Sequence, residues 1–168
     1  MTISMYAASV PVFIKGLNNM KGWLHKAQAH AEAKKFDVNV LPGMRLAPDM
    51  LPLTAQVLIA CDGAKNGSSR LAGVEPPRFE DNEKTVAELV ERIEKTIGYL
   101  ETLSAAQIDG TEDKDIVHAS RGGDKHFKGQ AYLLTHVLPN FWFHSTTAYA
   151  LLRHNGVDLG KKDFLGNG

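Results

Sequence analysis

The sequence predicts an all-α fold, an antiparallel four-helix bundle with a small β-hairpin between the third and fourth helices. Apolar residues recur three or four positions apart, which is the period of a buried helix face. The expected helices cover residues 10–34, 53–71, 85–103 and 130–154. Before the last helix the period changes, and Gly122-Gly123 indicates the turn of a short hairpin. Residues 1–168 contain no linker, repeat or low-complexity tract, so we expect a single domain.

Local signals predict where the helices begin. Pro11 is tolerated only in a first turn, so the first helix should begin near it. Asp49 is the expected N-cap of the second helix, with Pro52 in its first turn. Thr85 and Glu88 form a capping-box pattern, in which each side chain satisfies a free backbone N–H group of the third helix.

The second helix has an apolar stripe with many small residues. Ala60, Ala64 and Gly67 belong to this stripe, and their size indicates that another helix approaches closely. Cys61 is the single cysteine, which excludes an internal disulfide and a zinc cage built from cysteines. We expect its thiol to be buried beside Ala60 and slow to react.

The last helix contains a proline and is followed by a glycine-rich tail. Pro139 is expected to kink the helix, because its ring collides with the carbonyl of Thr135. The tail, residues 157–168, is expected to fold back over the bundle. Its apolar anchors are Leu159, Phe164 and Leu165.

Charge and hydropathy exclude two kinds of partner. The chain has 19 Lys and Arg residues and 19 Asp and Glu residues, so its net charge is zero. Nucleic-acid binding normally needs a surplus of positive charge, and we expect no nucleic-acid partner. The apolar runs fall short of the roughly 20 residues that cross a bilayer, and no signal peptide is evident. We therefore expect no membrane partner and a cytoplasmic location.

Polar residues on the last helix are the main candidates for chemistry. His136, Asn140 and His144 are spaced i, i+4 and i+8, which places them along one helical face. The two histidines are separated by about 12 Å of helical rise, too far to share one metal ion without ligands from another helix. Gln56, at the margin of the second helix's stripe, can face His144 or Asn140. The alternative is that these groups form structural hydrogen bonds in the core.

Other polar residues allow simpler interpretations. Asp62 can pair with an arginine, with Arg45, Arg70 and Arg153 as the candidates, or it can lie on a solvated face. His118 and His126 can face each other across the predicted hairpin. The run Phe141-Trp142-Phe143 is aromatic on all sides of the helix, which favours a core position together with a subunit contact. It predicts a homodimer.

Several motifs carry a family resemblance. Residues 44–53 (MRLAPDMLPL), 56–62 (QVLIACD), 70–73 (RLAG), 138–157 (LPNFWFHSTTAYALLRHNGV) and 159–166 (LGKKDFLG) span much of the chain. They resemble an uncharacterised bacterial domain-of-unknown-function family, a branch of the DinB/YfiT-like superfamily of four-helix bundles.

This resemblance implies a site between the second and last helices. Better-known members of the superfamily use a metal, held by one histidine on the second helix and a His-x-x-x-His pair on the last. Aligned by its Leu151-Leu152-Arg153 end, the last helix has His144 at the second histidine and Asn140 at the first. Gln56 falls near the third position. Amides are poor ligands for zinc or nickel, so His144 is the one remaining imidazole of the expected metal site.

The resemblance leaves two functions open. The first is a DinB-like bundle that binds a small molecule or a partner and keeps a degenerate metal site, with no metal as the simpler expectation. The alternative is a transferase or hydrolase that depends on a divalent metal, zinc or nickel, or on a thiol cofactor. Some superfamily members are thiol-dependent transferases. In both, the ligand-binding candidates are Gln56, Asn140 and His144, with Tyr149 and Arg153 added by the family motif.

Overall fold

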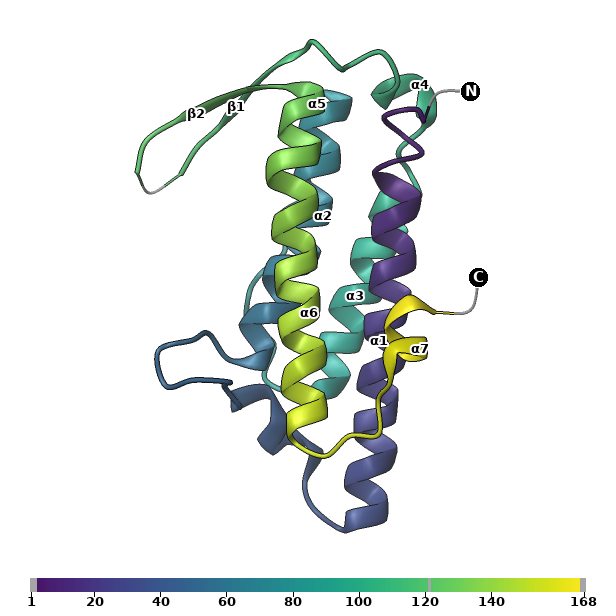
Figure 1. Ribbon diagram of the computed structural model, residues 1–168, viewed down its shortest axis with the longest axis vertical. Coiled ribbons are helices and arrows are strands. Elements are labelled where there is room, and N and C mark those ends of the chain that lie inside the picture. The colour runs from purple at the N-terminus through teal and green to yellow at the C-terminus, as the bar shows by residue number, and fades with distance from the viewer. Residues whose placement is uncertain (1–2, 121, 167–168) are drawn as a thin grey trace.

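The computed structural model describes residues 3–120 and 122–166. It confirms a helical bundle with a small antiparallel hairpin (Figure 1). The long helices are α1 (Val10–Lys34), α2 (Leu53–Ala72), α3 (Val86–Leu100) and a last helix formed by α5 (Gly129–Tyr132), a π-helical segment η2 (Leu133–Val137) and α6 (Leu138–His154). The shorter elements are a 3₁₀ helix η1 (Val38–Gly43), α4 (Ala105–Ile108), β1 (Asp115–His118), β2 (Lys125–Lys128) and α7 (Lys161–Leu165).

The four long helices run two in each direction. The hydrogen bond between Gln56 and His144 and the contact of Gly67 with Val137 set α2 antiparallel to α6. The 11-residue connection 74–84 follows α2 and returns the chain along the bundle, so α3 runs in the same direction as α2 (Figure 1). A long crossover of this kind is one of the known bundle connections.

The start of α3 agrees with the predicted capping residues, and the start of α2 does not. Thr85 and Glu88 form the predicted capping box at the start of α3. The predicted N-cap at Asp49 is wrong, because α2 begins at Leu53 with Pro52 in the N-cap position. The N–H of Leu53 donates to the carbonyl of Met44 at 2.9 Å. This bond closes a loop ahead of the helix, and Asp49 lies within that loop.

The last helix passes through Pro139 without ending. The π-helical segment η2 immediately precedes α6, and Pro139 lies in the first turn of α6. In a π-helical segment the backbone hydrogen bonds span five residues instead of the four of an α-helix, so the turn is wider. The wider turn accommodates the ring of Pro139, which was predicted to collide with the carbonyl of Thr135, and the helix continues into α6.

The contact between α2 and α6 depends on two glycines. A Cβ atom at Gly67 would collide with the side chain of Val137, and one at Gly63 would lie 3.2 Å from Nδ2 of Asn140. The predicted close approach of another helix to the small-residue stripe of α2 is thus confirmed, with α6 as the approaching helix.

The tail folds back over α1, as predicted, and lies beside it in Figure 1. The indole N–H of Trp23 donates to the carbonyl of Asp163 at 2.9 Å, and the ring of Phe164 stacks on Trp23 at 5.5 Å. Leu159 is buried. The predicted anchor Leu165 is wrong, since this side chain is 55% exposed on the outer side of a single helical turn. Residues 167–168 of the predicted tail lie outside the described residues.

The hairpin lies at the end of the bundle next to α5 (Figure 1). Its register pairs Val117 with His126 and His118 with Lys125. The predicted pairing of His118 with His126 is wrong, because neighbouring register positions project to opposite faces of a hairpin. Arg121, which directly precedes the predicted turn at Gly122-Gly123, lies outside the described residues.

Cys61 is fully buried, as predicted. Burial raises the pKa of its thiol to about 12, although a hydrogen bond with Thr96 opposes the shift. At neutral pH the group is therefore a protonated thiol within the core, which makes it a weak nucleophile.

Among the residues that the structure describes, no helix combines the length and the apolar character needed to cross a membrane.

We predict that Gly67→Ala destabilises the protein by about 1–3 kcal/mol, because its new methyl group overpacks against Val137. Gly22, on the exposed side of α1, has no neighbouring atom within 4 Å of the position of a Cβ and provides the matched control. Gly22→Ala should stabilise by about 0.5–1 kcal/mol, since alanine has the higher helix propensity. Urea unfolding followed by circular dichroism measures both. Equal stabilisation by the two substitutions would contradict the close approach of α2 and α6.

Candidate functional site

Two of the predicted site residues, Gln56 and His144, are in direct contact. Nδ1 of His144 lies 2.7 Å from Oε1 of Gln56, whose side chain is only 2% exposed. Nε2 of Gln56 donates to the carbonyl of Leu51 at 3.0 Å, which fixes the orientation of the amide. Its oxygen therefore faces the imidazole, and Nδ1 of a neutral His144 is the donor. Burial lowers the pKa of His144, which favours this neutral form.

Asn140 belongs to a separate groove and lies one turn before His144 in α6. The groove has a volume of about 330 Å³ and lies between α2, the last helix and the hairpin. It is lined by Ile59, Asp62, Gly63, Asn66, Arg70, His118, Tyr132, His136, Val137 and Asn140. The structure thus separates the predicted site into two parts, a hydrogen-bonded pair at Gln56 and His144 and an open polar groove at Asn140.

Two histidines and a tyrosine form one wall of this groove. The ring centroids of His118 and His136 are 4.5 Å apart, and Tyr132 stacks on His136 at 5.6 Å. Nδ1 of His118 is buried and has no hydrogen-bond partner among the described residues. An unsatisfied buried nitrogen of this kind is uncommon, and because it is enclosed by protein it is not presented to the groove.

Arg70 makes the groove electropositive. Its Nη1 donates to the hydroxyl oxygen of Tyr132 at 3.0 Å. Burial lowers the pKa of both His118 and His136, and the positive charges of Arg70 and Lys125 lower both values further. Both imidazoles are therefore neutral at pH 7, where each ring has one donor and one acceptor nitrogen.

Tyr149 and Arg153 lie away from both parts of the site. The ring of Tyr149 packs against Trp23 at 5.5 Å and against Phe164 at 5.6 Å, under the tail. Arg153 is exposed in the last turn of α6. The structure therefore does not bring these two predicted ligand-binding residues to Gln56, His144 or Asn140.

The aromatic run of α6 is divided among three surroundings. Phe141 is buried against Phe13, with ring centroids 5.0 Å apart, and Trp142 lies 5.8 Å from Phe164 of the tail. Phe143 is 57% exposed and meets the ring of His144 edge-on at 5.1 Å. One aromatic side chain of the run, Phe143, thus remains at the surface beside the pair at Gln56 and His144.

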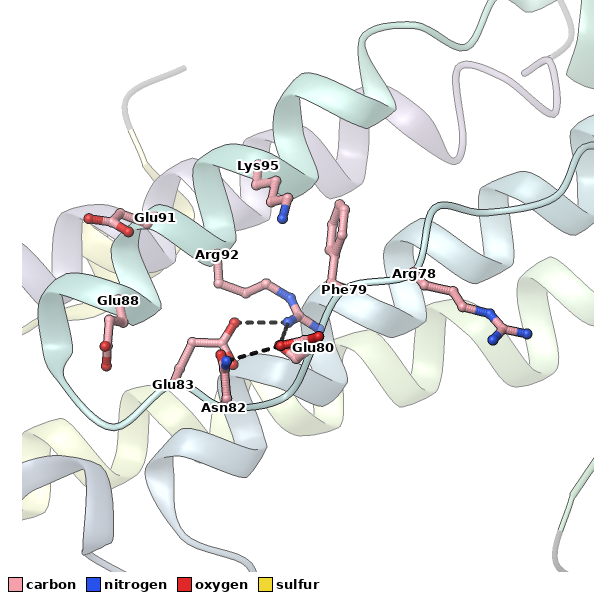
Figure 2. Close-up of a pocket in the computed structure, with 9 residues that line it drawn as sticks. All are labelled: Arg78, Phe79, Glu80, Asn82, Glu83, Glu88, Glu91, Arg92 and Lys95. Atoms are coloured by element: carbon pink, nitrogen blue, oxygen red, sulfur yellow. Dashed lines mark hydrogen bonds and ion pairs between the residues drawn. The ribbon is translucent and has the colours of Figure 1, made fainter.

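A larger hollow, about 520 Å³, lies between α3 and the connection 74–84 (Figure 2). Its centre is Arg92, which is 3% exposed and donates to Glu83 at 2.8 Å and to Asp81 at 2.8 Å. It also bonds the carbonyl of Glu80 at 2.9 Å. These bonds hold the connection against α3, so we assign the hollow a structural role.

Asp62 links this charge network to α2. It accepts from Arg92 at 3.2 Å and from Lys65 at 2.8 Å. The predicted partners Arg45, Arg70 and Arg153 are wrong, because the long crossover places Arg92 of α3 next to this turn of α2. The ring of Phe79 lies close to both cations, 4.4 Å from Nζ of Lys65 and 5.1 Å from the guanidinium of Arg92.

The positions implied for a metal do not fit zinc or nickel. Gln56 and His144 bond each other, while Asn140 lies in the groove. The set contains one imidazole and two amides, and amide groups are weak ligands for these ions. Within 3–120 and 122–166, no three His, Cys, Asp or Glu side chains are grouped so that they could hold a metal ion.

Sequence reasoning missed the groove residues Arg70, His118 and Tyr132 as members of one site. Arg70 and Tyr132 are 62 positions apart, and their contact depends on the antiparallel register of α2 with α6. A signal was present in the spacing of Asn66 and Arg70, since residues four positions apart share a helical face. Nothing local linked that face to the hairpin.

Comparisons with known proteins agree with the fold. The family model described as a domain of unknown function (DUF1993) matches residues 5–165. A crystal structure of a DinB family member protein from Shewanella denitrificans is similar at 44% sequence identity and a TM-score of 0.91. The match covers 97% of this chain and 92% of that chain. No curated protein matches.

We predict that His144→Leu costs about 1–3 kcal/mol, because the buried amide oxygen of Gln56 then has no donor. The double variant Gln56→Leu/His144→Leu should recover most of this loss, since both polar partners are removed together. Urea unfolding measures both variants. If His144→Leu leaves stability unchanged or increases it, the pair is not a structural element and His144 is instead retained for function.

The pH dependence gives a second measurement on the same variant. A histidine with a lowered pKa in the folded state binds a proton first in the unfolded state. Stability is therefore complete above the ordinary pKa of about 6.5 and falls as the pH decreases through that value. His118 and His136 contribute in the same direction. Wild-type protein should lose stability below this pH more steeply than His144→Leu.

Proposed function

The chain belongs to the DUF1993 family, and we propose that it is a DinB-like bundle that binds a small molecule in the groove between α2, the last helix and the hairpin. The observation that carries the proposal is the convergence of Arg70, His118, His136 and Asn140 on one cavity of about 330 Å³. Small-molecule sites are typically cavities of roughly 300–1,000 Å³ with a few convergent polar groups.

The surroundings of the groove support this proposal. Its walls come from helices whose contact is fixed by Gly63 and Gly67, so the cavity is formed before a ligand arrives. The neutral rings of His118 and His136 have both donor and acceptor nitrogens, which suits recognition of an organic molecule. A cytoplasmic location is part of the proposal, since a lone reduced thiol is ordinary in a reducing compartment.

A transferase or hydrolase that depends on a metal or a thiol cofactor is the second candidate. It is supported by the similarity to a DinB family member protein and by the superfamily resemblance of α6. We rank it lower because His144 is the one imidazole of the implied set and is already bonded to Gln56. A degenerate metal site is therefore our proposal for Gln56, Asn140 and His144.

We also propose a homodimer. The supporting observation is Phe143, an aromatic side chain that is 57% exposed on α6. Leu51, whose carbonyl is bonded to Gln56, is also exposed at 48%. Exposed aromatic side chains are enriched at protein interfaces.

The proposal predicts that elemental analysis, done after removal of any purification tag, finds well below one zinc or nickel ion per chain. It also predicts that fragments screened by two-dimensional NMR shift the amide signals of α2, the hairpin and the last helix around the groove. Stoichiometric metal would favour the second candidate function.

Asn66→Phe provides the matched control for the fragment screen. Asn66 is half-buried and lines the groove, so a phenyl ring at this position should fill part of the cavity. Fragments that bind in the groove should lose affinity for this variant. Binding that persists unchanged, or that maps elsewhere on the bundle, would contradict the proposed site.

If the chain forms a homodimer, light scattering at high concentration should report twice the chain mass, and Phe143→Ser should shift the protein toward monomer. Phe141 is not a suitable variant because it is buried against Phe13. Thr146, exposed one turn away on α6, provides the control in the form Thr146→Ser. A monomer at every concentration would remove the proposal.

A further inference from the structure

We propose that the ligand of the groove is a small planar organic anion, a carboxylate bound through Arg70 and packed on the rings of His118 and His136. This inference rests on the proposed function and names its class of ligand. It follows from the charges, the available donors and the shape of the cavity.

The charge of the groove favours an anion. Arg70 and Lys125 lie close enough to His118 and His136 to act on both rings electrostatically. Asp62 is the carboxylate that lines the groove, and it is bonded to Lys65 at 2.8 Å and to Arg92 at 3.2 Å. Its negative charge is thus compensated by two cations, while the positively charged Arg70 also lines the cavity.

Arg70 and Tyr132 together present oriented donors. Nη1 of Arg70 donates to the hydroxyl oxygen of Tyr132 at 3.0 Å, so the hydroxyl proton of Tyr132 is available to another acceptor. Burial raises the pKa of Tyr132, which keeps that proton in place. The guanidinium has further N–H groups in its planar fork, a geometry that matches a carboxylate.

The wall of the groove favours a flat organic body. The half-buried rings of His118 and His136 lie with their centroids 4.5 Å apart, and Tyr132, which is only 1% exposed, supports His136 from behind at 5.6 Å. The amide of Asn140 provides a polar contact at the edge of the groove. The volume of about 330 Å³ is at the lower end for ligand sites, which excludes a large molecule such as a dinucleotide.

Benzoate, benzamide and benzylamine test the inference, because they share a ring and differ in charge. Titration calorimetry of the untagged full chain should give benzoate an affinity at least about tenfold above that of benzamide, as expected for a charge-assisted bond. Benzylamine should bind more weakly than both. Equal affinities for benzoate and benzamide would overturn the inference.

Two variants connect the effect to the groove. Arg70→Met should lower benzoate affinity about tenfold or more and leave benzamide affinity within about twofold. Asn140→Asp, of nearly unchanged shape, adds a negative charge to the cavity and should likewise weaken benzoate and spare benzamide. An unchanged benzoate affinity in both variants would overturn the assignment, even if one variant folds poorly, because the other reports independently.

The outcomes separate this inference from the proposed function. Binding of benzamide or other uncharged fragments in the groove, without preference for benzoate, would overturn the proposal that the ligand is an anion but would leave the small-molecule site standing. Absence of any binding in the groove by NMR overturns both.

Discussion

The close packing of α2 against α6 is the contact on which both parts of the candidate site depend. It requires glycine at Gly67, where a Cβ atom would collide with Val137, and space at Gly63 next to Asn140. This antiparallel register brings Gln56 to His144 at one end of the interface and Arg70 to Tyr132 at the other. One helix pair thus forms a structural hydrogen bond and an open groove that begins one helical turn away, at Asn140.

The charged network at Arg92 complements that contact from the other side of α2. Arg92 is 3% exposed, and its partners Asp62, Asp81 and Glu83 come from α2 and from the long connection. Figure 2 shows Glu83 of the connection beside Arg92. Removing one partner of a buried ionic network is strongly destabilising, because charge then remains uncompensated. The network holds the crossover in place and also compensates Asp62 at the edge of the groove.

Much of the fold was predictable because helical period is a local property of the sequence. The strong period of α3, with Thr85 and Glu88 at its start, predicted that helix correctly. The small residues of α2 predicted a close neighbour, and Gln56 was correctly expected to face His144 or Asn140. The N-cap at Asp49 failed because the bond from Leu53 to Met44, nine positions apart, decided the end of the loop.

The site was harder to predict than the fold, and the π-helical segment gives the physical reason. Along the last helix, His144, Asn140, Val137 and Tyr132 all face α2, and their spacings are four, three and five. A regular α-helix repeats at three and four, so the step of five belongs to the segment Leu133–Val137. Extrapolating a regular helix back from His144 therefore does not predict that Tyr132 faces Arg70. π-helical segments are frequent at functional sites, and in this chain the segment brings Tyr132 and His136 to the groove wall.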